Sequence, residues 1–233
     1  MTREYLRLLT KRCSQWLFLV SLLVIQGAEC LSTPYGENAA EAFMSIRSLN
    51  KFGLLFTPLF CLWNTPVYQV CSEIKLTVRM ESPFGYIACY ARLSAVSSLL
   101  YVFMSNCIAV PRALLFAGSA ESGEKLLPLL FLQLLFYMNC SLIFYLVSVI
   151  GGGKTYLGFL AVVGYGVLDY AVSNLTWFFV STFYVVCSPE VFQSPPLLLR
   201  NFSVLTGTLL CLILIDVFAT DRRGFMERGK ADA

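Results

Sequence analysis

Six long runs of apolar residues constrain this chain more than any other feature of its sequence. They lie at about 14–31, 52–71, 89–110, 127–150, 155–175 and 201–219. Each run is close to the roughly 17 to 25 residues that a helix needs to cross the hydrocarbon core of a bilayer. Lipid offers the backbone no hydrogen-bond partners, so a chain that crosses it folds into helices that satisfy their own backbone groups. The sequence therefore predicts an all-α, polytopic membrane bundle of six transmembrane helices, forming a single domain over residues 1–233.

Composition supports the same class of protein. Hydrophobic residues make up 58% of the 233 positions and charged residues only 13%, which is more apolar surface than a soluble core of this size can bury. The chain has no histidine, the commonest metal ligand and general base. Its net charge of +3 is too small to indicate a nucleic-acid surface. We therefore expect no catalytic residue, no metal site, no cofactor and no nucleic-acid partner.

The distribution of Lys and Arg predicts the orientation. With six crossings, twelve of the 17 basic residues fall on the side of the N-terminus and five on the other. Basic residues concentrate on the cytoplasmic side, so both chain ends are predicted to be cytoplasmic. Residues 1–13 mix leucines with basic residues, which predicts an amphipathic helix on the anionic lipids of the inner leaflet. The run at 14–31 could instead belong to a cleaved signal peptide, but Glu29 spoils the cleavage site, so we interpret it as a retained span.

Two connections between the runs differ from ordinary loops. The cytoplasmic segment 72–88 is charged, and a helix is expected to stop or restart at its Ser82-Pro83 pair. The segment 176–199 is aromatic but is interrupted by Ser188-Pro189 and Pro195-Pro196. A full crossing would leave backbone groups unsatisfied at these breaks, so we predict an outer re-entrant segment, with a longer fifth span as the alternative.

Glycines mark two further features. Residues 151–155 read Gly-Gly-Gly-Lys-Thr, which is similar to a phosphate-binding P-loop, but Ser148 stands where that motif requires its first glycine. We therefore interpret these residues as a tight cytoplasmic turn. Within the fifth run, Gly164 and Gly166 predict a close approach between helices.

Two acidic residues fall in or beside the apolar runs. Asp169 lies in the middle of the fifth run, and a carboxylate inside the bilayer usually faces a pathway or a partner. We take Asp169 and Asn174 as candidate translocation-path or buried polar residues, with a helix-to-helix hydrogen bond as the alternative role. Asp216 lies near the inner end of the sixth run, where Arg222 or Arg223 could pair with it.

The order of these parts resembles a permease subunit of the type 2 ABC exporter class. The resemblance covers nearly the whole chain and rests on the layout: a basic amphipathic start, six spans, a charged cytoplasmic segment between spans two and three, and an interrupted segment between spans five and six. It implies a separate ABC-type ATPase subunit, a second permease copy or similar permease, and a bacterial plasma membrane. It also implies that 72–88 couples to the ATPase, with these contact residues: Glu73, Lys75, Arg79, Glu81, Ser82, Pro83 and Phe84.

Other classes of function remain open. The chain could be a secondary carrier or channel that uses Asp169 as a proton or ion site, although no inverted repeat is visible in the sequence. It could also be a membrane scaffold without transport of its own. An intramembrane enzyme is disfavoured, because the sequence offers no histidine, no Gly-x-Ser-x-Gly motif and only isolated acids.

Overall fold

A computed structural model describes residues 13–32, 55–72, 82–116, 121–174 and 195–231. These ranges contain seven helices and no strand, so the predicted all-helical class is confirmed for them. The helices are α2 (Cys13–Ser32), α5 (Thr57–Ser72), α7 (Pro83–Asn106), α8 (Ala109–Phe116), α9 (Glu121–Ile150), α10 (Thr155–Asn174) and α13 (Pro195–Ala231).

Six of these helices coincide with the six predicted runs, with different ends. Helix α7 begins at Pro83, earlier than the predicted start at 89, and the short helix α8 follows it as a separate element. Helix α13 begins at Pro195, so residues 195–199 belong to this helix and not to the predicted re-entrant segment. Proline is favoured in the first turn of a helix because its missing N–H would have no partner there. The predicted N-terminal amphipathic helix and the rest of 176–199 lie outside the described residues.

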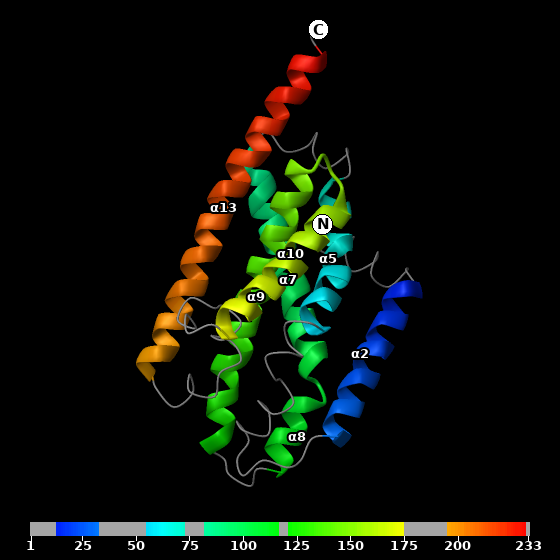
Figure 1. Cartoon of the computed structure of the whole chain (residues 1–233), viewed down its shortest axis with the longest axis vertical. Helices are drawn as coiled ribbons and strands as arrows, with labels where there is room; N and C mark the ends of the chain where they lie inside the picture. Colours follow the sequence, from blue (N-terminus) through cyan, green and yellow to red (C-terminus); the bar gives the residue numbers. More distant parts are fainter. Residues whose placement is uncertain (1–12, 33–54, 73–81, 117–120, 175–194, 232–233) are drawn as a thin grey trace.

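The six long helices alternate in direction along the bundle (Figure 1). Four parts of the chain consequently lie toward the same end: the start of α2, the end of α5 with the start of α7, the turn between α9 and α10, and the end of α13. Helix α10 crosses the bundle obliquely, and α13 runs along one edge and extends past the other helices. Helix α9 packs against α13, α10, α7 and α5 and forms the centre of the fold.

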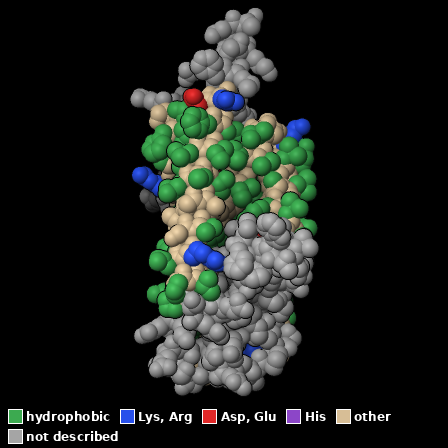
Figure 2. Space-filling view, turned by 60° about the vertical axis from the view of Figure 1, so that its left-hand side comes forward, with side chains coloured by type: hydrophobic (Ala, Val, Ile, Leu, Met, Phe, Trp, Pro, Cys, Tyr) green, Lys and Arg blue, Asp and Glu red, His purple; other side chains and the backbone are tan. Residues whose placement is uncertain are grey.

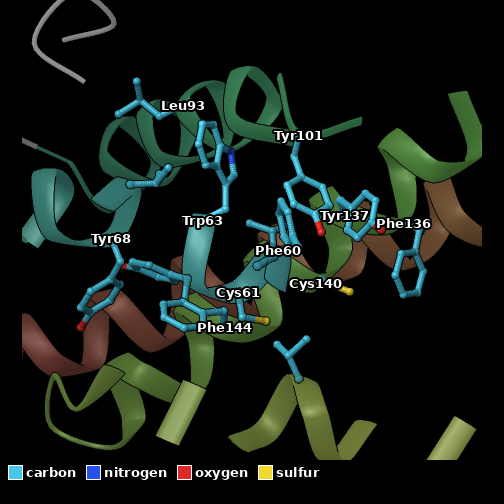
Figure 3. Packing of buried hydrophobic residues seen from close by; sticks show 14 of the residues in the cluster. Phe60, Cys61, Trp63, Tyr68, Leu93, Tyr101, Phe136, Tyr137, Cys140 and Phe144 are labelled. Carbon is cyan, nitrogen blue, oxygen red and sulfur yellow. The ribbon is translucent and has the colours of Figure 1, made fainter. Parts of the chain in front are cut away.

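Aromatic side chains fill the space between α5, α7 and α9 (Figure 3). The rings of Phe60 and Tyr101 meet edge to face with centroids 5.2 Å apart, and Tyr137 lies 4.7 Å from Phe60 and 5.0 Å from Tyr101. Such pairs add stability beyond that of the area they bury. The Tyr101 hydroxyl donates to the carbonyl oxygen of Phe56 at 2.6 Å, so its polar end is satisfied inside the core.

The turn between α9 and α10 is as tight as the glycines predict. Gly152 and Gly153 have φ angles of 74° and 87°, in the left-handed region that favours glycine. The amide of Gly151 donates to the carbonyl oxygen of Val147, and that of Gly153 to Ser148, both at 2.8 Å. These bonds satisfy carbonyl groups that the end of α9 would otherwise leave unpaired.

The close approach of α9 and α10 occurs at Gly158 and not at Gly164. A Cβ on Gly158 would stand 2.5 Å from the carbonyl oxygen of Phe144 and would overlap the Ser148 hydroxyl. A Cβ on Gly164 would have nothing within 4 Å, so the predicted contact at this glycine is wrong. The sequence interpretation failed because glycine marks a close contact only on the face of the helix that meets its neighbour.

Within the described residues, three helical stretches are long and apolar enough to cross a membrane: Pro83–Asn106, Leu126–Ile150 and Pro195–Arg222. The chain is therefore a helical membrane protein. Large apolar side chains cover the face that includes α13 (Figure 2), among them the exposed Leu210, Leu214 and Phe218. Only 17% of the apolar window of α13 is buried inside the protein, which leaves most of this helix free to face lipid.

Candidate functional site

Polar side chains from three helices meet inside the apolar bundle. The amide nitrogen of Asn64 on α5 donates to the Ser141 hydroxyl on α9 at 2.7 Å and lies 3.4 Å from the Tyr90 hydroxyl on α7. The Tyr90 hydroxyl lies 3.0 Å from both the hydroxyl and the carbonyl oxygen of Ser141. All three residues are fully buried. Hydrogen bonds of this kind hold helices together where the hydrophobic effect between them is weak.

Helix α13 joins this group through a tyrosine. The Tyr145 ring on α9 packs on the Tyr90 ring with centroids 4.5 Å apart, and its hydroxyl shares a hydrogen bond of 2.8 Å with Thr220 on α13. Thr220 also donates to the backbone carbonyl oxygen of Asp216 at 2.7 Å. We call these six residues the interior polar cluster: Asn64, Tyr90, Ser141, Tyr145, Asp216 and Thr220. The cluster links four helices, which are α5, α7, α9 and α13.

The carboxylate of Asp216 is the unusual member of the cluster. Asp216 is 0% exposed, and neither of its carboxylate oxygens has a hydrogen-bond partner among the described residues. The expected pairing with Arg222 is not seen, since the Asp216 carboxylate has no hydrogen-bond partner and the Arg222 side chain is exposed. The side chain of Arg223, the other expected partner, lies outside the described residues. A buried ionised carboxylate without partners is very costly, so this group is suited to holding a proton or neutralising a bound cation.

A second set of polar contacts involves earlier residues of α9. The Asn106 amide on α7 donates to the Gln133 side chain at 3.0 Å, and the Asn139 amide donates to the Leu205 carbonyl oxygen on α13 at 3.1 Å. These four residues are buried. Their donors are used in helix-to-helix bonds, so we assign this set to packing and not to chemistry.

Asp169 is buried on α10, at 8% exposure, and lies near the Cys140 thiol of α9. The Asn139 amide on α9 is a possible partner for such a helix-to-helix hydrogen bond, but it donates to the carbonyl oxygens of Leu135 and Leu205. Asn174, the other candidate, is the last residue of α10. Their role on a translocation path stays a prediction.

The predicted coupling segment is described only at its end. Ser82 caps α7, and its hydroxyl accepts a hydrogen bond from the Gly85 amide at 3.1 Å, with Pro83 in the first turn. The expected restart of a helix at this pair is thus confirmed, and it follows from the capping preference of serine. Phe84 is 65% exposed. The remaining coupling residues lie outside the described residues: Glu73, Lys75, Arg79 and Glu81.

Sequence reasoning missed most of the interior polar cluster. It assigned Asp216 to the inner interface and gave no role to Asn64, Tyr90 or Ser141. A usable signal was present, since an amide side chain within an apolar run must find a partner inside the bundle. The tyrosines carried no such signal, because a tyrosine in a membrane helix is equally common at the interface.

Comparisons of the chain with models of protein families, with curated proteins and with solved structures found no match. Within the described ranges, no group of three or more Cys, Asp or Glu side chains is placed to hold a metal ion.

Proposed function

We propose that this chain is a six-span membrane transport protein with both ends in the cytoplasm, and that it serves as the permease subunit of an ATP-driven exporter in a plasma membrane. The interior polar cluster carries the proposal of transport. Membrane proteins keep ionisable groups within their spans where a pathway or a moving part needs them, because such groups are costly elsewhere. Asp216 fits that requirement, because it is fully buried and its carboxylate has no hydrogen-bond partner among the described residues.

The exporter assignment rests on the layout of the bundle. Alternating helices direct the end of α5, the start of α7, the glycine turn and the end of α13 toward one end (Figure 1). That end carries the excess of basic residues typical of the cytoplasmic side. A separate ATPase could seat on the 73–81 link there. A second permease copy would complete the translocation path between two bundles.

Co-purification tests this assignment. The tagged protein is isolated in mild detergent from its native membrane, and the chains bound to it are identified by mass spectrometry. The same is done with Arg79→Glu combined with Glu81→Lys, and with Lys154→Glu as a matched charge reversal at the exposed turn of the same end. The proposal expects a P-loop ATPase with the wild type and with Lys154→Glu, but not with the double variant. Failure to recover any ATPase with the wild type would contradict it.

The burial of Asp169 favours one alternative, a gradient-driven carrier. Such a carrier uses an intramembrane carboxylate as its ion site. In that case, Asp169→Asn would abolish transport that follows an imposed ion gradient in vesicles, and no ATPase would be needed. Unchanged gradient-driven transport in the variant would exclude this function for Asp169.

A further inference from the structure

The contact between α13 and the rest of the bundle contains a buried acid, Asp216, whose carboxylate has no hydrogen-bond partner among the described residues. Helix α13 packs mainly on α9 and also on α7. Most of its side chains point away from the protein, and Asp216 is among the few that point inward with 0% exposure. An isolated helix in lipid would not place an acid against apolar neighbours unless that position had a use.

No described Lys or Arg side chain pairs with the Asp216 carboxylate. Its carboxylate interacts electrostatically with Tyr90 on α7 and Tyr145 on α9, and both of these tyrosines also interact with Cys71 of α5. None of these can carry a positive charge. Among the described residues, the carboxylate has neither a hydrogen-bond donor nor an ion-pair partner. The ionised form is therefore strongly destabilised in this position, and the neutral acid is compatible with it.

The backbone carbonyl oxygen of Asp216 has a side-chain hydrogen-bond partner, whereas its carboxylate has none among the described residues. Its carbonyl oxygen accepts a bond from Thr220, which in turn shares a bond with Tyr145. This chain of bonds fixes the rotation of α13 so that residue 216 faces α7 and α9. Ionisation would then place a bare charge in the helix contact, and the apolar part of α13 is less buried inside the protein than that of α7 or α9.

We propose that Asp216 is a proton-binding site that clamps α13 onto α7 and α9. With the proton bound, the neutral acid allows the three helices to pack as observed. When the proton leaves to water, the carboxylate charge has no partner, and α13 moves away from the contact so that water can reach it. The proposal does not depend on whether an ATPase or a gradient drives transport, because it concerns only this helix contact.

Infrared difference spectroscopy tests the proton. The protein is reconstituted in vesicles and titrated from acid to alkaline pH, and the C=O stretch of protonated carboxyl groups is followed. An exposed Asp loses its proton near pH 4, so a band that persists at neutral pH reports a buried acid. We expect such a band in the wild type, a smaller band in Asp216→Asn, and an unchanged band in Asp221→Asn, an exposed acid on the same helix. Asp169 is also buried, so the Asp216 signal is the part of the band that Asp216→Asn removes. An unchanged neutral-pH band in Asp216→Asn, or no such band in the wild type, would overturn the proposal.

Replacing Na⁺ by K⁺ or choline distinguishes a metal cation from a proton. A carboxylate band that shifts with the cation and vanishes in Asp216→Asn would overturn the proposal in favour of a cation site. If the Asn variant does not fold, Asp216→Glu provides the second variant. The band must then move from the frequency of isotope-labelled aspartate to that of glutamate.

Spin labels test the clamp. Cysteines replace Lys154, in the turn after α9, and Arg222 on α13, in a background without other cysteines; both side chains are exposed. We expect the distance between the labels to increase when the Asp216 band disappears at alkaline pH, and to stay constant in Asp216→Asn. Loss of the band without a change in distance would show that the proton does not hold α13 in place.

Discussion

Helices α9 and α13 are both long apolar helices, yet the fold uses them in opposite ways. In α9, 61% of the apolar window is buried inside the protein, whereas in α13 the figure is 17%. Helix α9 contacts α5, α7, α10 and α13, while α13 lies along one edge of the bundle (Figure 1). An apolar run therefore shows that a helix can enter lipid, but not how much of the helix meets lipid and how much meets protein.

Polar residues indicate which part of a helix contacts protein and which part contacts lipid better than apolar residues do. Helix α9 carries Gln133, Asn139 and Ser141 on buried positions, and each donates to or accepts from another helix. Helix α13 has exposed Ser203 and Thr206, and the Ser203 hydroxyl donates only to the Leu199 carbonyl oxygen of its own helix. Hydroxyl groups that satisfy themselves on their own helix can remain in lipid, whereas amide groups need a neighbour.

The largest expected effect comes from removing a leucine that α13 buries. Leu205 is 1% exposed, so Leu205→Ala should leave a cavity and lower the free energy of unfolding by about 2 to 5 kcal/mol. Leu210 is 58% exposed on the same helix. Leu210→Ala should lower the free energy of unfolding by less than about 1 kcal/mol, since lipid fills the space. Denaturation in mixed detergent micelles measures both. Equal losses would contradict the lipid-facing role of α13.

A smaller effect is expected at the contact between α9 and α10. Gly158→Ala places a methyl group against the Phe144 carbonyl oxygen and should cost about 1 to 3 kcal/mol through overpacking. Gly164→Ala on the same helix meets nothing within 4 Å and should be neutral or slightly stabilising. Thermal unfolding of the two variants in the same detergent measures both effects. If Gly164→Ala were the less stable variant, the placement of α10 against α9 would be refuted.

The smallest effect is expected from one hydroxyl of the interior polar cluster. Ser141→Ala removes the acceptor of Asn64 and the partner of Tyr90, and should cost about 0.6 to 1.7 kcal/mol, as for other hydrogen bonds between membrane helices. Ser203→Ala is the matched control, because this hydroxyl is exposed and bonds within its own helix. The comparison uses the same unfolding assay. A loss in Ser203→Ala as large as that in Ser141→Ala would show that the cluster has no special role in stability.

Sequence reasoning predicted much of the fold because the length and polarity of a span are local properties. The six apolar runs became six helices, and the serine cap at Ser82 and the glycine turn after Ile150 followed from local backbone chemistry. Which face of a helix meets which neighbour is a property of the whole bundle. Gly158 and Gly164 look alike in the sequence, and only one of them touches α9.

The same limit applies to the candidate site. Asp216 and Arg222 are close in sequence, which suggested an ion pair near the interface, but the carboxylate faces the interior and Arg222 is exposed. The interior polar cluster joins residues as distant in sequence as Asn64 and Ser141. No local sequence pattern predicts such a contact, because the contact depends on how α5, α7 and α9 pack.

The two ends of the bundle provide the most direct test of the membrane topology. Single cysteines are placed at residue 154, in the turn between α9 and α10, and at residue 119, between α8 and α9, in a background without other cysteines. Intact cells are treated with a membrane-impermeant maleimide. The account predicts that Ser119→Cys is labelled from outside, while Lys154→Cys reacts only after the membrane is permeabilised. Labelling of both positions, or of Lys154→Cys alone, in intact cells would contradict the proposed six-span topology with cytoplasmic ends.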